Sequence, residues 1–179
     1  LTGQIPDSLF QLPKLQTVAL VSNCFSGTIP SLICNSTTLK TLSLDGLRSS
    51  SSCQNLIFPD LSTSYILKGK IKEGIPTCLF QMPSLNTLHL SGNGLTGTLP
   101  TDITLASNLV DLSLSHNRLE GIIPKIFQER VWFNLDLSFN KFSGTLTSKF
   151  ATQIGNLSVL EDLGLVVTNT SSMSYTMTT

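Results

Sequence analysis

The sequence predicts an α/β solenoid, in which short parallel strands stack along one face of a coiled chain. Two observations predict this fold. A phrase of the form L-x-G-x-I-P returns about every 24 residues, and a longer frame, L-x-x-L-x-L-x-x-N, recurs in register with it. Periods of this length are typical of repeat architectures, whose units bury their apolar faces against one another.

The phrase divides the 179 residues into six units separated by 24, 46, 24, 24 and 23 residues. The units begin at Leu1, Phe25, Ile71, Leu95, Leu119 and Phe142. The long interval is one period plus an insertion, which we place at residues 49–70. We therefore expect a single solenoid over residues 1–169 and an irregular tail or cap remnant at residues 170–179, where no leucine pattern continues.

The frame L-x-x-L-x-L-x-x-N predicts one strand in each unit. It occupies residues 15–23, 39–47, 85–93, 109–117 and 132–140. Its L-x-L centre alternates with period two, which puts the leucines on one face of a short strand. The asparagine that follows can satisfy backbone groups where the chain turns away. Because the frame resumes in phase after the insertion, we expect one continuous sheet from Val18 to Leu137.

The joined consensus L-x-x-L-x-x-L-x-L-x-x-N-x-L-x-G-x-I-P resembles the plant-type leucine-rich repeat, closely over residues 1–48 and 71–146 and loosely over 147–169. That repeat occurs in ectodomains of receptor-like kinases and receptor-like proteins and in polygalacturonase-inhibiting proteins. The resemblance implies a right-handed superhelix with a parallel sheet on its concave face. Short strands, turns and 3-10 helices would lie on the convex side.

Four positions depart from this consensus. Leu47 and Thr168 stand where asparagine is expected, Glu73 replaces the phrase glycine, and Thr147 replaces the phrase proline. We expect the solenoid to be distorted over residues 47–73 and to decay after about Leu165.

The composition excludes several classes of function. The net charge is zero and charged residues make up only 12% of the chain, so no basic surface for nucleic acid is expected. No apolar run reaches the roughly 18 residues that span a bilayer. The four cysteines form no C-x-x-C pair, and we expect no metal and no cofactor.

A catalytic triad is not expected either. His89, Ser113 and Asp136 occupy the same phase of successive strands, but the serine lies between the other two, whereas a triad needs the base between nucleophile and acid. We therefore predict a non-enzymatic protein with polar residues on a solvated sheet.

The outward positions of the strands form the predicted ligand-binding surface. Phe133 and Phe139 stand out there, because an aromatic pair directed away from the core indicates a contact site or a face covered by another segment. The candidate residues are Lys40, Asp45, Asn86, His89, Ser91, Asp111, Ser113, His116, Phe133, Asn134, Asp136 and Phe139. Other aromatic residues (Phe10, Phe80, Phe127 and Trp132) fall at phases that predict core packing.

The cysteines predict disulfides Cys34–Cys78 and Cys24–Cys53 in an oxidising compartment. Cys34 and Cys78 lie at nearly the same phase of adjacent units, and adjacent units are about 5 Å apart, within reach of a disulfide. Four free thiols in a cytosolic array remain the alternative.

Three N-x-S/T sequons lie at Asn35, Asn156 and Asn169, a number that chance alone explains. If the protein is secreted, Asn35 is the first candidate for glycosylation, because it falls on the convex side.

Together with the resemblance, these features predict a secreted or cell-surface recognition domain. It would bind a protein, peptide or wall glycan through the concave face and the insertion. A structural component of an extracellular matrix or surface coat is the alternative.

Overall fold

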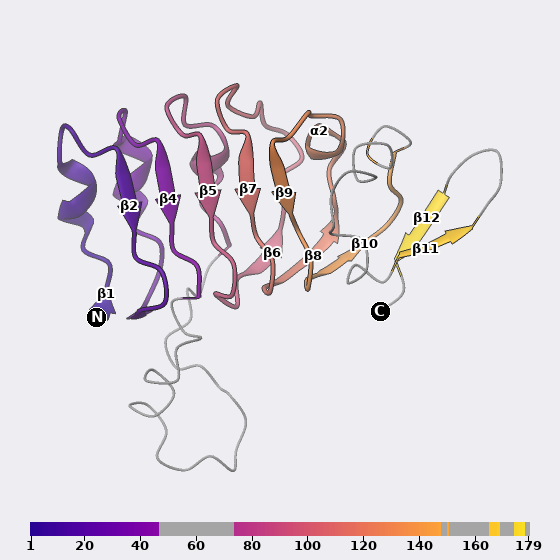
Figure 1. Cartoon of the computed structure of the whole chain (residues 1–179), viewed down its shortest axis with the longest axis horizontal. Coiled ribbons are helices and arrows are strands. Elements are labelled where there is room, and N and C mark those ends of the chain that lie inside the picture. The colour runs from indigo at the N-terminus through magenta and orange to yellow at the C-terminus, as the bar shows by residue number, and fades with distance from the viewer. Residues whose placement is uncertain (47–73, 148–149, 151–164, 169–173, 178–179) are drawn as a thin grey trace, which may run out of the picture.

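The structure is a computed structural model that describes residues 1–46, 74–147, 150, 165–168 and 174–177. Its main element is a parallel sheet to which successive units each add one strand (Figure 1). The strand order is β2-β4-β5-β7-β9. These strands span Thr17–Ala19, Thr41–Ser43, Thr87–His89, Asp111–Ser113 and Asn134–Asp136.

Two smaller parallel sheets and short helices complete the units. One sheet pairs β1 (Thr2–Gln4) with β3 (Cys24–Ser26). The other has the order β10-β8-β6 and consists of Lys141–Ser143, Arg118–Ile122 and Thr96–Thr98. The helices are the 3-10 turns η1 (Asp7–Gln11), η2 (Ser31–Asn35) and η3 (Thr77–Phe80) and the α-helical turn α2 (Lys125–Gln128). Within the described ranges, no helix has both the length and the apolar character that crossing a bilayer would require.

The five-stranded sheet continues across the insertion, as the repeat phase predicts. Leu42 of β4 pairs in register with Leu88 of β5, although 46 residues separate them. Val18, Leu112 and Leu135 occupy the same column on the other strands. The predicted insertion at residues 49–70 lies outside the described residues.

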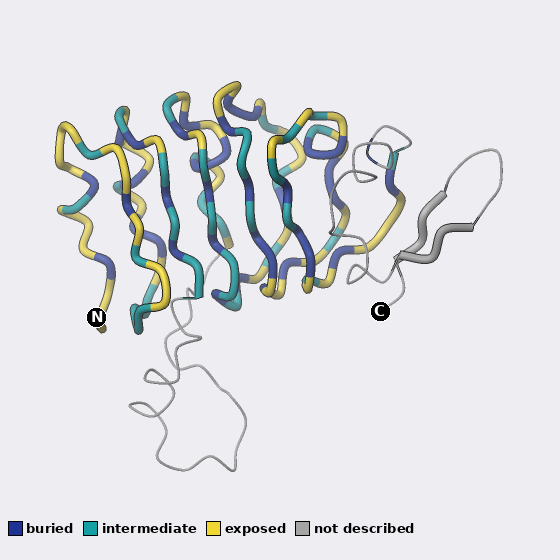
Figure 2. Tube along the Cα trace, viewed as in Figure 1, coloured by how far each residue is buried: buried dark blue, intermediate teal, exposed yellow. Residues whose placement is uncertain are grey.

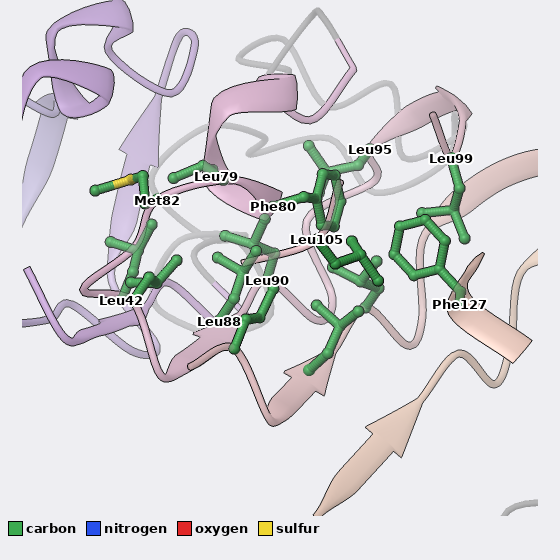
Figure 3. Packing of buried hydrophobic residues seen from close by; sticks show 14 of the residues in the cluster. Leu42, Leu79, Phe80, Met82, Leu88, Leu90, Leu95, Leu99, Leu105 and Phe127 are labelled. Atoms are coloured by element: carbon green, nitrogen blue, oxygen red, sulfur yellow. The ribbon is translucent and has the colours of Figure 1, made fainter. Parts of the chain in front are cut away.

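The apolar column faces a continuous core. Leu42, Leu88 and Leu112 are fully buried, and buried positions alternate with more accessible ones along each strand (Figure 2). Figure 3 shows Phe80 and Phe127 among the leucines, where their rings meet edge to face with centroids 5.4 Å apart.

The aromatic residues expected in the core pack there, although Trp132 is less buried than the three phenylalanines. Phe10, Phe80 and Phe127 are buried. Trp132 is only partly buried, and its indole Nε1 donates a hydrogen bond to the Phe127 carbonyl at 2.8 Å. A tryptophan that keeps its N–H at the core boundary in this way satisfies a donor that full burial would leave unpaired.

The asparagines that follow β5, β7 and β9 tie their own units to their neighbours. The Asn117 amide donates to the carbonyls of Leu90 and Leu114 at 3.0 and 2.8 Å. Its Oδ1 accepts the backbone N–H groups of Asn93 and Leu95, both at 3.0 Å. Three-residue strands leave many backbone groups without a sheet partner, and this buried side chain supplies those partners.

The same pattern repeats on both sides of Asn117. Asn93 donates to Leu44 and Leu90, and Asn140 donates to Leu114 and Leu137. We call this series Asn93, Asn117 and Asn140 the asparagine ladder. The exceptional Leu47 lies outside the described residues.

Thr147, which stands where the L-x-G-x-I-P motif has proline, supplies a backbone hydrogen bond that proline could not make. The Thr147 backbone N–H, which proline would lack, donates to Oε1 of buried Gln128 at 2.6 Å. Gln128 in turn donates from Nε2 to the Ile123 carbonyl at 2.6 Å. The departure from the consensus thus satisfies a buried amide.

The C-terminal segment contains two further strands. Leu165–Thr168 (β11) pairs antiparallel with Ser174–Met177 (β12), whereas the other described strand pairs are parallel. The leucine pattern does not continue into residues 170–179, so it could not predict this pairing. The pairing instead involves valine, threonine and tyrosine, which have high strand propensity.

We predict that Asn117→Ala lowers the free energy of unfolding by about 2–4 kcal/mol, because it leaves several buried backbone groups unpaired. Asn108→Ala is the matched control, since the exposed Asn108 amide donates one described hydrogen bond, to Pro83, and its loss should cost less than about 1 kcal/mol. Urea denaturation measures both values. Equal losses for the two variants would contradict the role given to the ladder.

Candidate recognition surface on the five-stranded sheet

The predicted binding residues lie on one face of the five-stranded sheet. We call this face, formed by the outward side chains of the strands and the residues that follow them, the sheet surface. Lys40, Asn86 and His116 are exposed on it, and His89 and Asp111 are half-buried. The register aligns His89, Ser113 and Asp136 on successive strands, with Ser43 next to His89.

An imidazole between two carboxylates links three neighbouring units. His89 Nε2 lies 2.8 Å from Asp111 Oδ1, and His89 Nδ1 lies 3.7 Å from Asp45 Oδ2. An ionised carboxylate only accepts hydrogen bonds, so Nε2 carries the proton in the contact with Asp111. Asp111 Oδ1 also accepts the Asn134 amide at 2.9 Å, which extends the network to β9.

Asp45 is held in place from two sides. Its Oδ1 accepts the Ser91 backbone N–H at 2.7 Å, and its Oδ2 accepts the Ser43 hydroxyl at 3.1 Å. The carboxylate therefore has a fixed direction beside His89. Charge-assisted hydrogen bonds of this kind are the stronger class.

Serine hydroxyls connect this network to Asp136. Ser91 Oγ and Ser113 Oγ are 2.7 Å apart, and Ser115 Oγ lies 3.1 Å from Ser91 Oγ. Ser113 Oγ reaches Asp136 Oδ2 at 3.5 Å, and Asp136 Oδ1 accepts both the hydroxyl and the backbone N–H of Ser138. Polar contacts thus run from the residues after β4 to those after β9.

The Asp136 carboxyl is stabilised in its ionised form. Burial alone would raise its pKa. Hydrogen bonds from the Ser138 hydroxyl, the Ser115 hydroxyl and the Ser138 backbone, together with the charge of His116, outweigh that effect and hold the pKa below its ordinary value.

The C-terminal end of the surface is aromatic. Phe133 is 83% exposed and Phe139 is 45% exposed, so both are directed away from the core, as the repeat phase predicts. The Phe139 ring stacks on the His116 ring with centroids 4.0 Å apart and an interplanar angle of 13°. An exposed apolar edge therefore adjoins the polar network.

His116 and Phe139 also share an unusual backbone conformation. Their φ angles are +53° and +52°, and Gly92 occupies the equivalent position with φ +69°. This residue directly precedes the ladder asparagine, at the point where the chain leaves the strand. A bulky side chain in the left-handed region is uncommon, and such strain concentrates at functional sites.

His89 and Ser113 align on neighbouring strands, but each contacts a different aspartate. His89 directs Nε2 to Asp111, and Ser113 donates to Asp136, so the histidine and serine do not act as a base and nucleophile pair. Within the described part of the chain, no group of three or more histidine, cysteine or acidic side chains is arranged to hold a metal ion.

Sequence reasoning did not identify Ser43, Ser115 and Ser138 as partners of the carboxylates. Ser115 and Ser138 are buried, and an inward-facing serine carries no sign of ligand contact in the sequence. Their alignment could have identified them, since both occupy the same position of the repeat frame as Ser91, a predicted binding residue.

The outward side chains of the sheet β10-β8-β6 differ in kind from those of the five-stranded sheet. They combine Arg118, Glu120 and Lys141 with threonines and with Ile122, which is 56% exposed. Glu120 aligns with Lys141 in register, so opposite charges are neighbours there. This face offers a mixed surface without the aromatic cluster of the five-stranded sheet.

Disulfide bonding is present in the N-terminal half. Cys34 and Cys78 are bonded, with their Cα atoms 5.7 Å apart, and they join the ends of η2 and η3. Cys24 is also disulfide-bonded. Its predicted partner, Cys53, lies outside the described residues.

Comparisons with known proteins agree with this architecture. Residues 84–105 and 108–129 match the family model described as Leucine Rich Repeat. No curated protein matches the sequence. The chain is a leucine-rich-repeat solenoid of the plant type, and its structural neighbours include ectodomains of plant receptor kinases.

Three solved structures illustrate the similarity. One is the ectodomain of the membrane receptor kinase GASSHO1/SCHENGEN3 from Arabidopsis thaliana in complex with CASPARIAN STRIP INTEGRITY FACTOR 2, with a TM-score of 0.65 and 31% identity over 85% of this chain and 16% of that chain. The Arabidopsis receptor kinase HAESA, in complex with the peptide hormone IDA and the co-receptor SERK1, has a TM-score of 0.63 and 29% identity over 88% of this chain and 22% of that one.

The third is a plant ice-binding protein, with a TM-score of 0.52 and 34% identity over 79% of this chain and 47% of that chain. The chain thus spans less than a quarter of either receptor structure and about half of the ice-binding protein. Because the neighbours differ in function, the fold alone does not assign one.

We predict that the stabilising effect of the Asp136 carboxylate depends on pH. Because its pKa in the folded chain lies below the ordinary 3.8, its contribution is fully present above that value and is lost as the pH falls through the folded pKa. The difference in unfolding free energy between the natural chain and Asp136→Asn should therefore be at its full value near pH 5 and shrink below about pH 4. Urea unfolding across this range measures it, and a difference that widens toward acid would contradict the assignment.

Proposed function

We propose that the chain is a non-enzymatic, extracellular recognition domain that binds a peptide or an extended protein segment along the sheet surface. The observation that carries the proposal is the junction of the hydrogen-bonded network Asp45–His89–Asp111 with the exposed aromatic edge at Phe133 and Phe139. Polar groups that fix direction beside an apolar anchor are typical of binding sites.

The aromatic edge supports binding on energetic grounds. Phe133 leaves most of its ring in water, and Phe139 additionally adopts a left-handed backbone conformation. The exposed ring does not favour folding, and glycine would suit the left-handed turn better than phenylalanine does. Both are explained if the rings contact a partner, because aromatic residues dominate the energy of interfaces.

The remaining predicted contacts give this surface its polar specificity. Lys40 and Asn86 extend it toward the N-terminal units, and Asn134, Asp136 and His116 border the aromatic edge. The structure of HAESA with a peptide hormone supports a peptide as the class of ligand, ahead of a wall glycan.

The disulfides support an extracellular location. Cys34–Cys78 is formed and Cys24 is bonded. Disulfides persist in oxidising compartments and are rare in the cytosol. The receptor ectodomains among the structural neighbours agree with this location.

We predict that replacing Phe133 and Phe139 by serine abolishes ligand binding while changing stability little. The probe is a phage-displayed library of random dodecapeptides selected against the secreted, oxidised chain. Selected peptides should bind the double variant about tenfold or more weakly, because exposed aromatic anchors carry much of an interface's energy. The thermal midpoint should remain nearly unchanged, since neither ring is buried.

Ile122→Ser is the matched control, since Ile122 is a similarly exposed apolar residue on β8, outside the sheet surface. It should leave peptide binding intact. Equal affinity of the selected peptides for the double variant and the natural chain would refute the assigned surface. A chain that selects no peptide and instead self-associates as its concentration rises would favour the alternative role as a matrix or surface-coat component.

A further inference from the structure

A pocket lies between η1 and η2. Its walls are residues 10–13 of the first unit and Leu32 with residues 35–38 of the second. It encloses about 460 Å³ of space including its open mouth. Phe10 is buried in the pocket, whereas Leu12 is 52% exposed.

The pocket contains an unsatisfied polar group. Ser36 is only 7% exposed, and its hydroxyl is buried without a hydrogen-bond partner. Its backbone N–H is used, because it donates to the Ile33 carbonyl at 3.1 Å. Buried hydroxyl groups normally have partners, so an orphan that lines a pocket indicates that a ligand supplies one.

The sequon at Asn35-Ser36-Thr37 forms part of the same wall. Asn35 is exposed at the end of η2, and Thr37 is exposed beside it. The disulfide from Cys34 to Cys78 fixes the residue next to Asn35 to the following unit. The pocket wall therefore combines the Asn35 side chain, which can accept a glycan, with the unpaired Ser36 hydroxyl and the apolar side chain of Leu12.

We propose that Asn35 carries an N-linked glycan whose first N-acetylglucosamine occupies this pocket. One face of the sugar ring, formed by C–H groups, packs against Leu12 and Pro13. The Ser36 side chain, whose oxygen is covered by neighbouring atoms in this structure, turns to pair with a polar group of the sugar. The proposal relies on the extracellular location proposed above, but not on any ligand of the sheet surface.

The covalent step is a glycosyl transfer from a lipid diphosphate-linked oligosaccharide in the secretory pathway. The bond between sugar C1 and the phosphate oxygen breaks, and a bond between C1 and Asn35 Nδ2 forms. The amide loses one proton to the transferase's base, and the lipid diphosphate departs as an anion. No oxidant or reductant is required.

The test uses the full chain, secreted from a eukaryotic host that makes high-mannose glycans, with Asn156→Gln and Asn169→Gln to leave Asn35 as the remaining sequon. Glycopeptide mapping should show Asn35 occupied. One portion is trimmed with endoglycosidase H, which leaves a single N-acetylglucosamine, and another is treated with peptide N-glycosidase, which removes the whole glycan and converts Asn35 to aspartate.

The trimmed chain should melt at the temperature of the untreated chain, because the first sugar fills the pocket. The fully deglycosylated chain should melt about 2–4 °C lower. The Asn35→Gln variant, which carries neither the glycan nor the new charge, should melt at the temperature of the fully deglycosylated chain and so separates the loss of the sugar from the gain of the charge.

Two further variants locate the effect. Leu12→Ser should remove the difference between trimmed and deglycosylated chains, whereas Val21→Ser, at another exposed apolar residue, should preserve it. An unoccupied Asn35, or equal melting temperatures for trimmed and deglycosylated chains, would overturn the proposal. Because neither readout involves peptide binding, its failure is distinguishable from failure of the proposed recognition function.

Discussion

The structure depends on the asparagine ladder that follows β5, β7 and β9. A strand of three residues makes few sheet hydrogen bonds, and two adjacent strands of this length would not be stable alone. Asn117 compensates because one amide reaches carbonyls of two units and its oxygen accepts two N–H groups from the preceding turn. The leucines then merge into one core because the asparagines hold the units in register.

This constraint also shapes the sheet surface. To direct the asparagine inward, the preceding residue adopts the left-handed conformation, as Gly92, His116 and Phe139 do. That residue continues the contacts between units, since the backbone N–H of Gly92 donates to Ser115 and that of His116 donates to Ser138. The conformation suits glycine, so the aromatic residues at two of these positions are better explained by a role at the surface than by folding.

Much of the fold could be predicted from the sequence because the repeat carries its own register. The period placed Leu42 beside Leu88 across a long insertion, and the phases brought Cys34 next to Cys78. The exposure of Phe133 followed from the same alternation. These features depend only on which residue of one unit lies beside which residue of the next.

The rest depends on side-chain geometry that a period does not contain. The contact of His89 with both Asp45 and Asp111 requires particular rotamers on three units. Ser115 and Ser138 support the Asp136 carboxylate from buried positions, and their alignment with Ser91 does not show which carboxylate they contact. The strand β12 was missed because its pairing with β11 is antiparallel and follows no leucine pattern.

A ligand bound along the five-stranded sheet, at the end where the polar network meets the aromatic edge, should protect the strands beneath it from exchange with solvent. Amide hydrogen exchange of the chain with and without a selected peptide tests this most directly. The account predicts slower exchange in β7, β9 and residues 138–140 when the peptide is bound, with exchange in β6 and β10 unchanged. Protection confined to β6, β8 and β10, with the five-stranded sheet unaffected, would contradict it.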